Sequence, residues 1–163
     1  MSDAVASPLP SGPGFTVAAV VLTDGAGRVL TVRKRGTEHF MHPGGKIEPG
    51  ESSDATAARE VREELGLILD AAGLELLGSY LTPAANEPGH WLKSDVYYWP
   101  EPVAGERIAA EIAESRWVDL DAPSGTLAPL FWAALDATRG RLAATASDLS
   151  GGGDGCGGSG SAG

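Results

Sequence analysis

Residues 43–67 read PGGKIEPGESSDATAAREVREELGL, and this stretch decides the fold. Its first nine residues contain too much proline and glycine for a helix and predict a shaped loop. The remainder predicts a helix over residues 53–65, with Ser52 or Ser53 as the cap of its first turn and Gly66 at its end. A loop that leads directly into an amphipathic helix is therefore the central element of the chain.

Three carboxylates fall on one side of the predicted helix. At 100° per residue, Glu60, Glu63 and Glu64 lie within an arc of about 100°, and a separate apolar face remains for docking on a core. Like charges so close together repel each other unless a cation is near. Magnesium fits this need because it takes oxygen ligands and completes its shell with water and phosphates. The alternative is an acidic helix face that is simply solvated.

The spacing of the whole segment resembles the signature of the Nudix hydrolases. Gly45 is followed by five residues, Glu51 by seven, and residues 59–67 then read REVREELGL, which matches the family at every fixed position. Seven fixed residue types and two apolar positions would match by chance in roughly one such chain in a million, so the motif is specific. The loop at 43–51 also resembles that of the MutT-type members.

The resemblance implies a reaction and a set of metal ligands. In the family, the helix glutamates hold divalent cations, and water attacks a phosphorus of a nucleoside diphosphate derivative. Carried over to this chain, the ligands are Glu60, Glu63 and Glu64, with the backbone carbonyl of Gly45 as a further candidate. The implied cofactor is Mg²⁺, with Mn²⁺ as an alternative, and it would polarise the phosphoryl oxygens and activate water.

Two further residues of the motif are expected to support the ligands. Arg59 precedes Glu63 by four residues, a spacing that lets its guanidinium orient that carboxylate. Glu51 can accept a hydrogen bond from Arg59 or from the loop. The alternative for Arg59 is an ordinary surface ion pair.

Two residues are candidates for the general base. One is Glu63. The other is Glu111, six residues before Trp117, because MutT-type members place a catalytic glutamate at a similar distance before such a strand. Glu111 lies in a segment of variable length, so a surface role is equally open for it.

Weaker signals concern the substrate. Arg33, Arg35 and Lys46 can offset phosphate charge, with solvated surface as the alternative for each. Asn86 belongs to a turn-rich loop at 86–90 that could form the rim of a base pocket, or simply join a hairpin. His42 precedes the loop where the family often has an apolar residue, and a packing role is favoured over contact with a base.

The substrate class remains open. Pro83 lies sixteen residues beyond Leu67, where a proline resembles the marker of the ADP-ribose pyrophosphatase group. The short chain and the MutT-like loop favour instead a nucleoside triphosphate, oxidised or not. A rival function is a catalytically weak Nudix-fold sensor that binds a nucleotide without cleaving it.

The rest of the chain predicts an α/β fold, a Nudix-type α/β/α sandwich with a mixed sheet and a catalytic loop and helix. A flexible segment is expected over residues 1–14, a Nudix domain over 15–146 and a disordered Gly/Ser-rich tail over 147–163. The first two strands look like a hairpin, and tryptophans 99, 117 and 132 are expected in the core. The predicted strands cover 15–23, 28–35, 74–81, 91–99 and 116–120, and a second helix covers 126–144.

Composition limits the partners. The net charge of −10 and pI of about 4.6 argue against non-specific binding to nucleic acid or to an anionic membrane. The single cysteine, Cys156, lies among glycines and excludes a Cys-based metal site. No stretch approaches eighteen consecutive apolar residues and no secretory signal is recognised, so a cytoplasmic protein is expected, with a small nucleotide as partner. A monomer and a homodimer are both compatible with the sequence.

Overall fold

The computed structural model describes residues 12–150 of the chain. Most of the expected N-terminal segment and nearly all of the Gly/Ser-rich tail lie outside these residues. The described elements are β1 (Gly14–Val21), β2 (Arg28–Lys34), β3 (Gly44–Lys46), α1 (Ser53–Leu65), a short 3₁₀ helix η1 (Ala71–Gly73), β4 (Glu75–Pro83), β5 (Trp91–Tyr98), β6 (Ile112–Asp119) and α2 (Pro129–Ser150).

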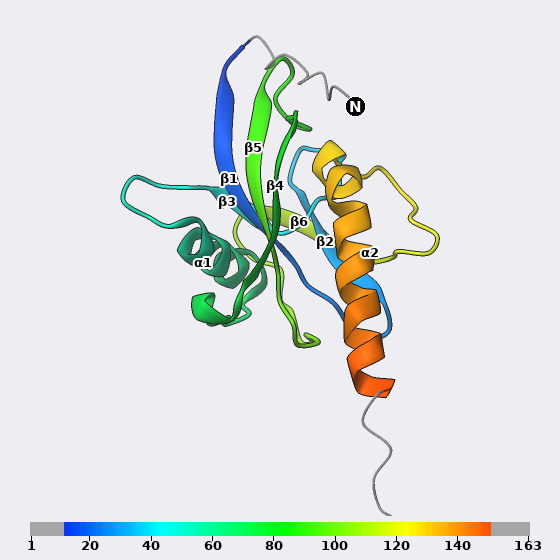
Figure 1. Cartoon of the computed structure of the whole chain (residues 1–163). Helices are drawn as coiled ribbons and strands as arrows, with labels where there is room; N and C mark the ends of the chain where they lie inside the picture. The colour runs from blue at the N-terminus through cyan, green and yellow to red at the C-terminus, as the bar shows by residue number, and fades with distance from the viewer. Residues whose placement is uncertain (1–11, 151–163) are drawn as a thin grey trace, which may run out of the picture.

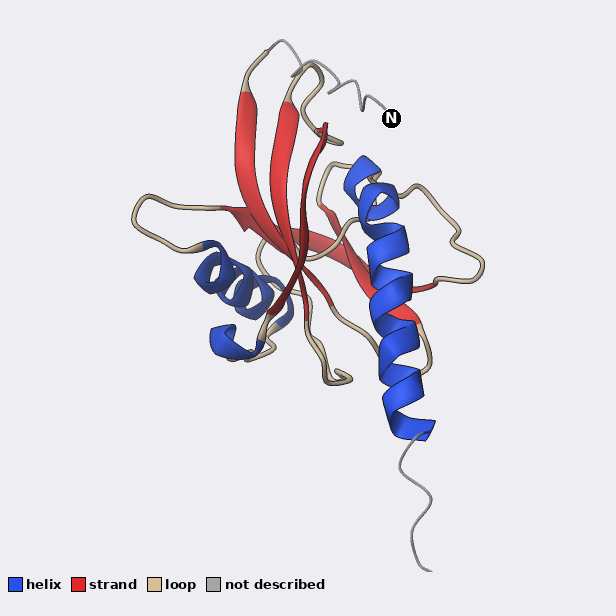
Figure 2. Cartoon of the chain, in the orientation of Figure 1, coloured by secondary structure: helices blue, strands red, loops and turns tan. Residues whose placement is uncertain are grey.

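The strands form two sheets. The larger sheet has the order β3-β1-β5-β4, with β1 parallel to β5 and the other neighbours antiparallel. The smaller sheet pairs β2 with β6 in antiparallel fashion. Helix α1 packs against β1 and β3, whereas α2 packs against β4 and β5. Figures 1 and 2 show the two helices on opposite sides of the larger sheet, which confirms the predicted α/β/α sandwich with a mixed sheet.

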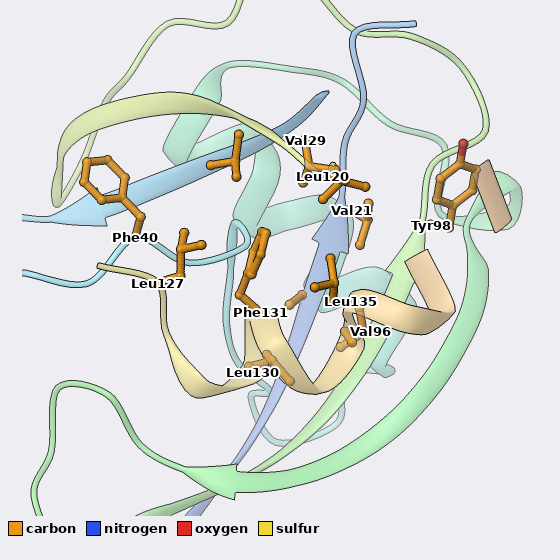
Figure 3. Close-up of a cluster of buried hydrophobic side chains, with 13 residues drawn as sticks. Val21, Val29, Phe40, Val96, Tyr98, Leu120, Leu127, Leu130, Phe131 and Leu135 are labelled. Carbon is orange, nitrogen blue, oxygen red and sulfur yellow. The ribbon is translucent and has the colours of Figure 1, made fainter. Parts of the chain in front are cut away.

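The second half of β1, residues 18–21, is buried on both faces, and each face belongs to a different core. Ala18 and Val20 pack in the cluster that includes Val61 and Leu65 of α1. The alternate residues Ala19 and Val21 pack in the cluster beneath α2 (Figure 3). The pattern follows from the period of two along a strand. It explains why residues 15–23 read as a nearly continuous apolar run.

The expected hairpin between the first two strands is present only next to its turn, and along most of their length the two strands belong to different sheets. Both edges of β1 are occupied, by β3 on one side and β5 on the other. Strand β2 therefore leaves the turn and pairs with β6. The two segments are joined next to the turn by a bridge between Thr23 and Val29 and by backbone hydrogen bonds from Leu30 N–H to the Leu22 carbonyl and from Asp24 N–H to the Arg28 carbonyl. Strand β3, which the sequence suggested was loop, pairs with β1 through its glycines. The strand propensity of two neighbouring segments does not reveal that each of them pairs with a strand far away in the sequence.

The predicted α1 agrees with the structure from Ser53 to Leu65. Ser52 is the N-cap residue, but its side chain makes no capping hydrogen bond. Gly66 ends the helix in the left-handed conformation with φ of 68°, as a C-terminal glycine commonly does.

The second helix differs from its prediction at both ends. It begins at Pro129 rather than at residue 126, because residues 126–128 pair with Phe40 through backbone hydrogen bonds and a proline suits a first helical position. It continues to Ser150, so residues 147–150, assigned to the tail, are helical. Trp132 is 50% exposed on this helix, and its expected core position is wrong. Among the described residues, no helix is both long and apolar enough to cross a membrane.

Candidate active site

The carboxylate-rich segment lies where α1 meets strand β3. The pairing of β3 with β1 holds Gly44 beside Ala19 and Gly45 beside Ala18. A Cβ atom on Gly44 would overlap the backbone of Ala18, so only glycine permits this approach. A Cβ on Gly45 would overlap the carboxylate of Glu60. Because neither glycine has a Cβ atom, β3 can approach β1 closely and the carboxylate of Glu60 has space beside Gly45.

Glu64 is the most deeply buried carboxylate of the site, with 1% of its surface exposed. One of its oxygens accepts a hydrogen bond from the backbone N–H of Gly44 at 3.2 Å. The other oxygen, Oε1, is buried and has no hydrogen-bond partner within the described chain. Burial raises the pKa of Glu64 to about 8. Burial also raises the pKa of Glu60, the neighbouring carboxylate.

Arg59 gathers three carboxylates at the edge of the site. It donates two hydrogen bonds to Glu51, from Nε at 2.7 Å and from Nη2 at 2.9 Å. Its Nη1 lies 3.0 Å from Glu60 and 3.3 Å from Glu63. Hydrogen bonding from Arg59 lowers the pKa of Glu51 to about 2, so that side chain stays charged. The contacts anticipated from the spacing of Arg59 with Glu63 and Glu51 are therefore present.

A cavity of about 750 Å³ opens beside this network. Its lining includes Gly45 and Glu60 from the carboxylate site, and three cationic side chains: Lys34, Arg35 and Lys46. Apolar residues from β1, β5 and the start of α2 complete the wall. A cavity with mixed apolar and charged lining suits a ligand that joins a heterocycle to phosphates.

The two candidates for the general base are placed differently. Glu111 lines the cavity and pairs with Lys34 at 3.1 Å. The backbone carbonyl of Glu111 accepts from Arg35 N–H at 2.8 Å, which fixes the segment beside the cavity. Glu63 is about half exposed, pairs with Arg59, and is not part of the cavity lining.

The predicted substrate residues divide into two groups. Arg35, Lys46 and Asn86 line the cavity. Arg33 does not: it donates to the carbonyl of Thr37 at 3.0 Å and pairs with Glu114 at 3.2 Å. Arg35 lies beyond the end of β2 at Lys34, and the pairing of β2 with β6 is irregular between Arg33 and Lys34, so strand alternation does not keep Arg35 on the face of Arg33.

Sequence reasoning missed several residues of the cavity, among them Lys34 and Phe15. Lys34 lines it and pairs with Glu111, and alternation along β2 offered a signal, since Lys34 and Arg33 fall on opposite faces. Phe15 also lines it, with Lys46 Nζ 3.8 Å from the ring centroid and His90 stacked on the ring at 5.3 Å. No local pattern distinguished Phe15 from an ordinary strand residue.

The donor set at α1 fits a hard divalent cation. Glu60 approaches Gly45, and Glu64 presents a buried oxygen without a partner. Carboxylate and carbonyl oxygens are the ligands that Mg²⁺ and Mn²⁺ prefer. In residues 12–150, no three carboxylate, imidazole or thiolate groups are arranged so that they could share one metal ion, and Glu63 pairs with Arg59.

Two curated proteins are similar to this chain over part of its length. An ADP-ribose pyrophosphatase of Methanocaldococcus jannaschii is 28% identical over 67% of this chain and 63% of its own length. The asymmetrical bis(5'-nucleosyl)-tetraphosphatase of Sus scrofa is 32% identical over 57% of this chain and 64% of its own length. The chain thus spans less than two thirds of these curated relatives.

A solved structure shares the fold. The crystal structure of a MutT protein from Methanosarcina mazei matches with a TM-score of 0.68 and 21% identity, covering 81% of this chain and 97% of that one. The family model described as the NUDIX domain matches residues 13–138, which include both core clusters and the whole carboxylate segment. The chain therefore belongs to the Nudix family.

Proposed function

We propose that the protein is a divalent-metal-dependent Nudix pyrophosphohydrolase that cleaves a phosphoanhydride bond in a nucleoside diphosphate derivative. The observation that carries the proposal is the position of Glu60 and Glu64 against the glycines of β3, at the edge of a cavity lined by cations. Membership of the Nudix family supports the same reaction class.

The metal ligands in this proposal are Glu60, Glu63 and Glu64, with the carbonyl of Gly45. The cation, when bound, would neutralise charge on the phosphate oxygens and make water more acidic. Arg59 and Glu51 have a positioning role, since their hydrogen bonds hold the helix carboxylates in place. Lys34, Arg35 and Lys46 add positive charge to an otherwise acidic protein where the phosphates would lie.

Proton transfer from the attacking water requires a carboxylate within reach of the phosphates. Glu111 has the stronger support, because it lines the cavity and its backbone is fixed by Arg35. Glu63 is the alternative base. Replacing the residue that acts as the general base should lower kcat roughly 100-fold or more. Comparing Glu111→Gln with Glu63→Gln at saturating magnesium separates the two, and a wild-type rate for Glu63→Gln would overturn its place in the metal site.

The reaction is tested with a substrate panel on the full chain. The panel contains ADP-ribose, the four dNTPs and an oxidised dNTP, with Mg²⁺, with Mn²⁺ and with EDTA. Release of AMP from ADP-ribose would identify one class, and release of pyrophosphate from a triphosphate the other. The variants Glu60→Gln and Glu64→Gln should lose turnover, whereas Glu101→Gln, an exposed glutamate far along the chain, serves as the matched control. Turnover that persists in EDTA, or none on any substrate, would contradict the proposal.

The second candidate function is a nucleotide sensor that binds without cleaving. Retention of every carboxylate of the motif weighs against it. Isothermal titration that showed tight nucleotide binding, together with no hydrolysis over hours, would favour the sensor over the hydrolase.

A further inference from the structure

Ala110 has an unusual backbone conformation directly before Glu111, the better supported candidate for the general base. Its φ is 54°, in the left-handed region, and every other positive φ among the residues that the structure describes belongs to a glycine. A side chain makes this region costly, and a residue other than glycine stays there only when the surrounding structure demands it. Ala110 is exposed, so packing of its methyl group does not impose this conformation. The cause therefore lies in the backbone on either side of it.

The backbone before Ala110 is tied to the end of helix α1. The N–H of Arg107 donates to the carbonyl of Leu65 at 2.8 Å, and the N–H of Ala109 donates to the carbonyl of Glu64 at 2.9 Å. These carbonyls belong to the last turn of α1, where no further helical N–H is available to them. The loop between β5 and β6 is therefore fixed to the helix that carries the carboxylates, and one of its anchors is the backbone of Glu64 itself.

The backbone after Ala110 is tied to the end of strand β2. The carbonyl of Glu111 accepts from Arg35 N–H at 2.8 Å, and Ile112 pairs with Lys34 in the ladder between β2 and β6. The register of this ladder shifts at the same point, which leaves one extra residue on β6. Such bulges bend a strand and redirect its side chains, and they are common next to active sites.

Ala110 forms the turn between these two anchors. The N–H of Ile112 donates to the carbonyl of Ala109 at 3.2 Å, which places Ala110 second and Glu111 third in a four-residue turn. A positive φ at the second position alone is typical of a type II′ turn, where glycine is the usual residue. Directly after this position the side chain of Glu111 reaches the cavity wall and pairs with Lys34 at 3.1 Å. A different φ at Ala110 would change the direction of the chain at Glu111 while both anchors stay in place.

We propose that Ala110 is a positioning residue whose left-handed conformation aims Glu111 into the cavity and holds it in register with the carboxylates of α1. This inference rests on the proposed function, and on Glu111 rather than Glu63 as the general base. It predicts that Ala110 affects the rate of the chemical step through Glu111. Binding of the substrate should be unchanged, because the cationic side chains of the cavity lie outside the turn.

The test compares two substitutions of similar size at position 110 of the full chain, in steady-state kinetics at saturating magnesium. Ala110→Val adds a β-branched side chain, which strongly disfavours the left-handed region, whereas Ala110→Asn adds a side chain that tolerates it. Ala110→Val should lower kcat roughly 10- to 100-fold with little change in KM, because misplacing a reacting group by about 1 Å can cost that much. Ala110→Asn and Ala110→Gly should keep a kcat close to that of the wild type. Ala110→Leu, which lacks the β-branch, should show a smaller loss and replaces Ala110→Val if that variant does not fold.

A double-variant cycle shows whether the effect passes through Glu111. In a Glu111→Gln background the general base is already absent, so Ala110→Val should cause no further loss of kcat. A merely structural role would give the same loss in both backgrounds. Ala104→Val is the matched control, since Ala104 is an exposed alanine of the same loop without a left-handed φ. This control should keep the kcat of the wild type.

Several results would overturn the inference while the proposed function stands. These are a wild-type kcat for Ala110→Val, an equal loss of kcat in Ala110→Asn, or the same loss from Ala110→Val with and without the Glu111→Gln substitution. A wild-type kcat for Glu111→Gln would also overturn it and would favour Glu63 as the base. Failure of the proposed function looks different, because the wild-type protein itself would then show no metal-dependent turnover on any substrate of the panel, and both proposals would fall together.

Discussion

At the scale of single residues, Glu64 is a carboxylate whose pKa is strongly raised by folding. Its carboxyl is buried beside Glu60 and has a pKa of about 8, against an ordinary value of 4.5. Between these two values the unfolded chain has lost the proton while the folded protein retains it. Stability of the metal-free protein should therefore fall as pH rises from about 4.5 to about 8, by up to about 1.4 kcal/mol per pH unit from this group.

This pH dependence is measurable by chemical denaturation in EDTA. Glu64→Gln carries no ionisable group and should show a flatter profile, with greater stability than the wild type near pH 8. A divalent cation favours the charged carboxylate and should flatten the wild-type profile as well. Equal slopes for wild type and Glu64→Gln in EDTA would contradict the prediction.

Arg59 gives a second prediction at this scale. Removal of its guanidinium leaves Glu51, Glu60 and Glu63 without their shared partner, and Lys cannot form the two-pronged contact with Glu51. Both Arg59→Ala and Arg59→Lys should lower kcat or metal affinity roughly 10- to 100-fold, because such supporting contacts commonly have effects of that size.

Arg62→Ala is the control for Arg59, since Arg62 is exposed on the same helix. It should retain most of the activity. Steady-state kinetics over a magnesium titration measures all three variants, and a wild-type profile for Arg59→Lys would show that the two-pronged contact is dispensable.

At the scale of elements, the roles of glycines depend on what surrounds them. Gly140 lies in α2, is exposed, and has open space where a Cβ would be placed. Gly140→Ala should raise the free energy of unfolding by about 0.5–1 kcal/mol, the difference in helix propensity. Gly45→Ala should instead displace Glu60 and lower activity, because its Cβ would meet that carboxylate. Denaturant unfolding and an activity assay on both variants test the contrast, and a fully active Gly45→Ala would refute it.

Helix α1 was predictable from sequence because its information is local. The serine at its N-cap position, the 3.6-residue period and Gly66 all lie within the helix or next to it. Strand β3 was not predictable in the same way, since its glycines become a strand only through pairing with β1. The partner of β2 lies in β6, far along the chain, and no short pattern specified it.

The residues of the site also divide into those that local sequence predicts and those that only the folded chain brings together. The spacing of Arg59 with the glutamates follows from helix geometry, so their contacts could be anticipated. The cavity is assembled from β1, β2, β3, the loop after β4 and the start of α2, and its members are neighbours only in the folded protein. Lys34 and Phe15 were missed for that reason, and Arg33 was included although its side chain faces Glu114.

At the scale of the whole molecule, the metal should act on the stability of the entire domain. A cation that binds the folded protein and not the unfolded chain stabilises by mass action, by about 2.7 kcal/mol at 100 times its Kd. Adding Mg²⁺ or Mn²⁺ should therefore raise the Tm in a concentration-dependent manner. Glu60→Gln should reduce the shift and Glu101→Gln should not. An acidic helix without a metal site predicts no shift in any of them.

The central position of β1 has a consequence for how the chain folds. This strand is made first, yet Gly14 pairs with Trp91 and Val21 with Tyr98, so the larger sheet cannot close until β5 is available. Contacts between such distant residues slow folding, because the entropy of a long loop is lost before the pairing is gained. During synthesis, the edge of the apolar β1 that pairs with β5 therefore stays unpaired until residues 91–98 are made, and it can pair with other chains in that interval.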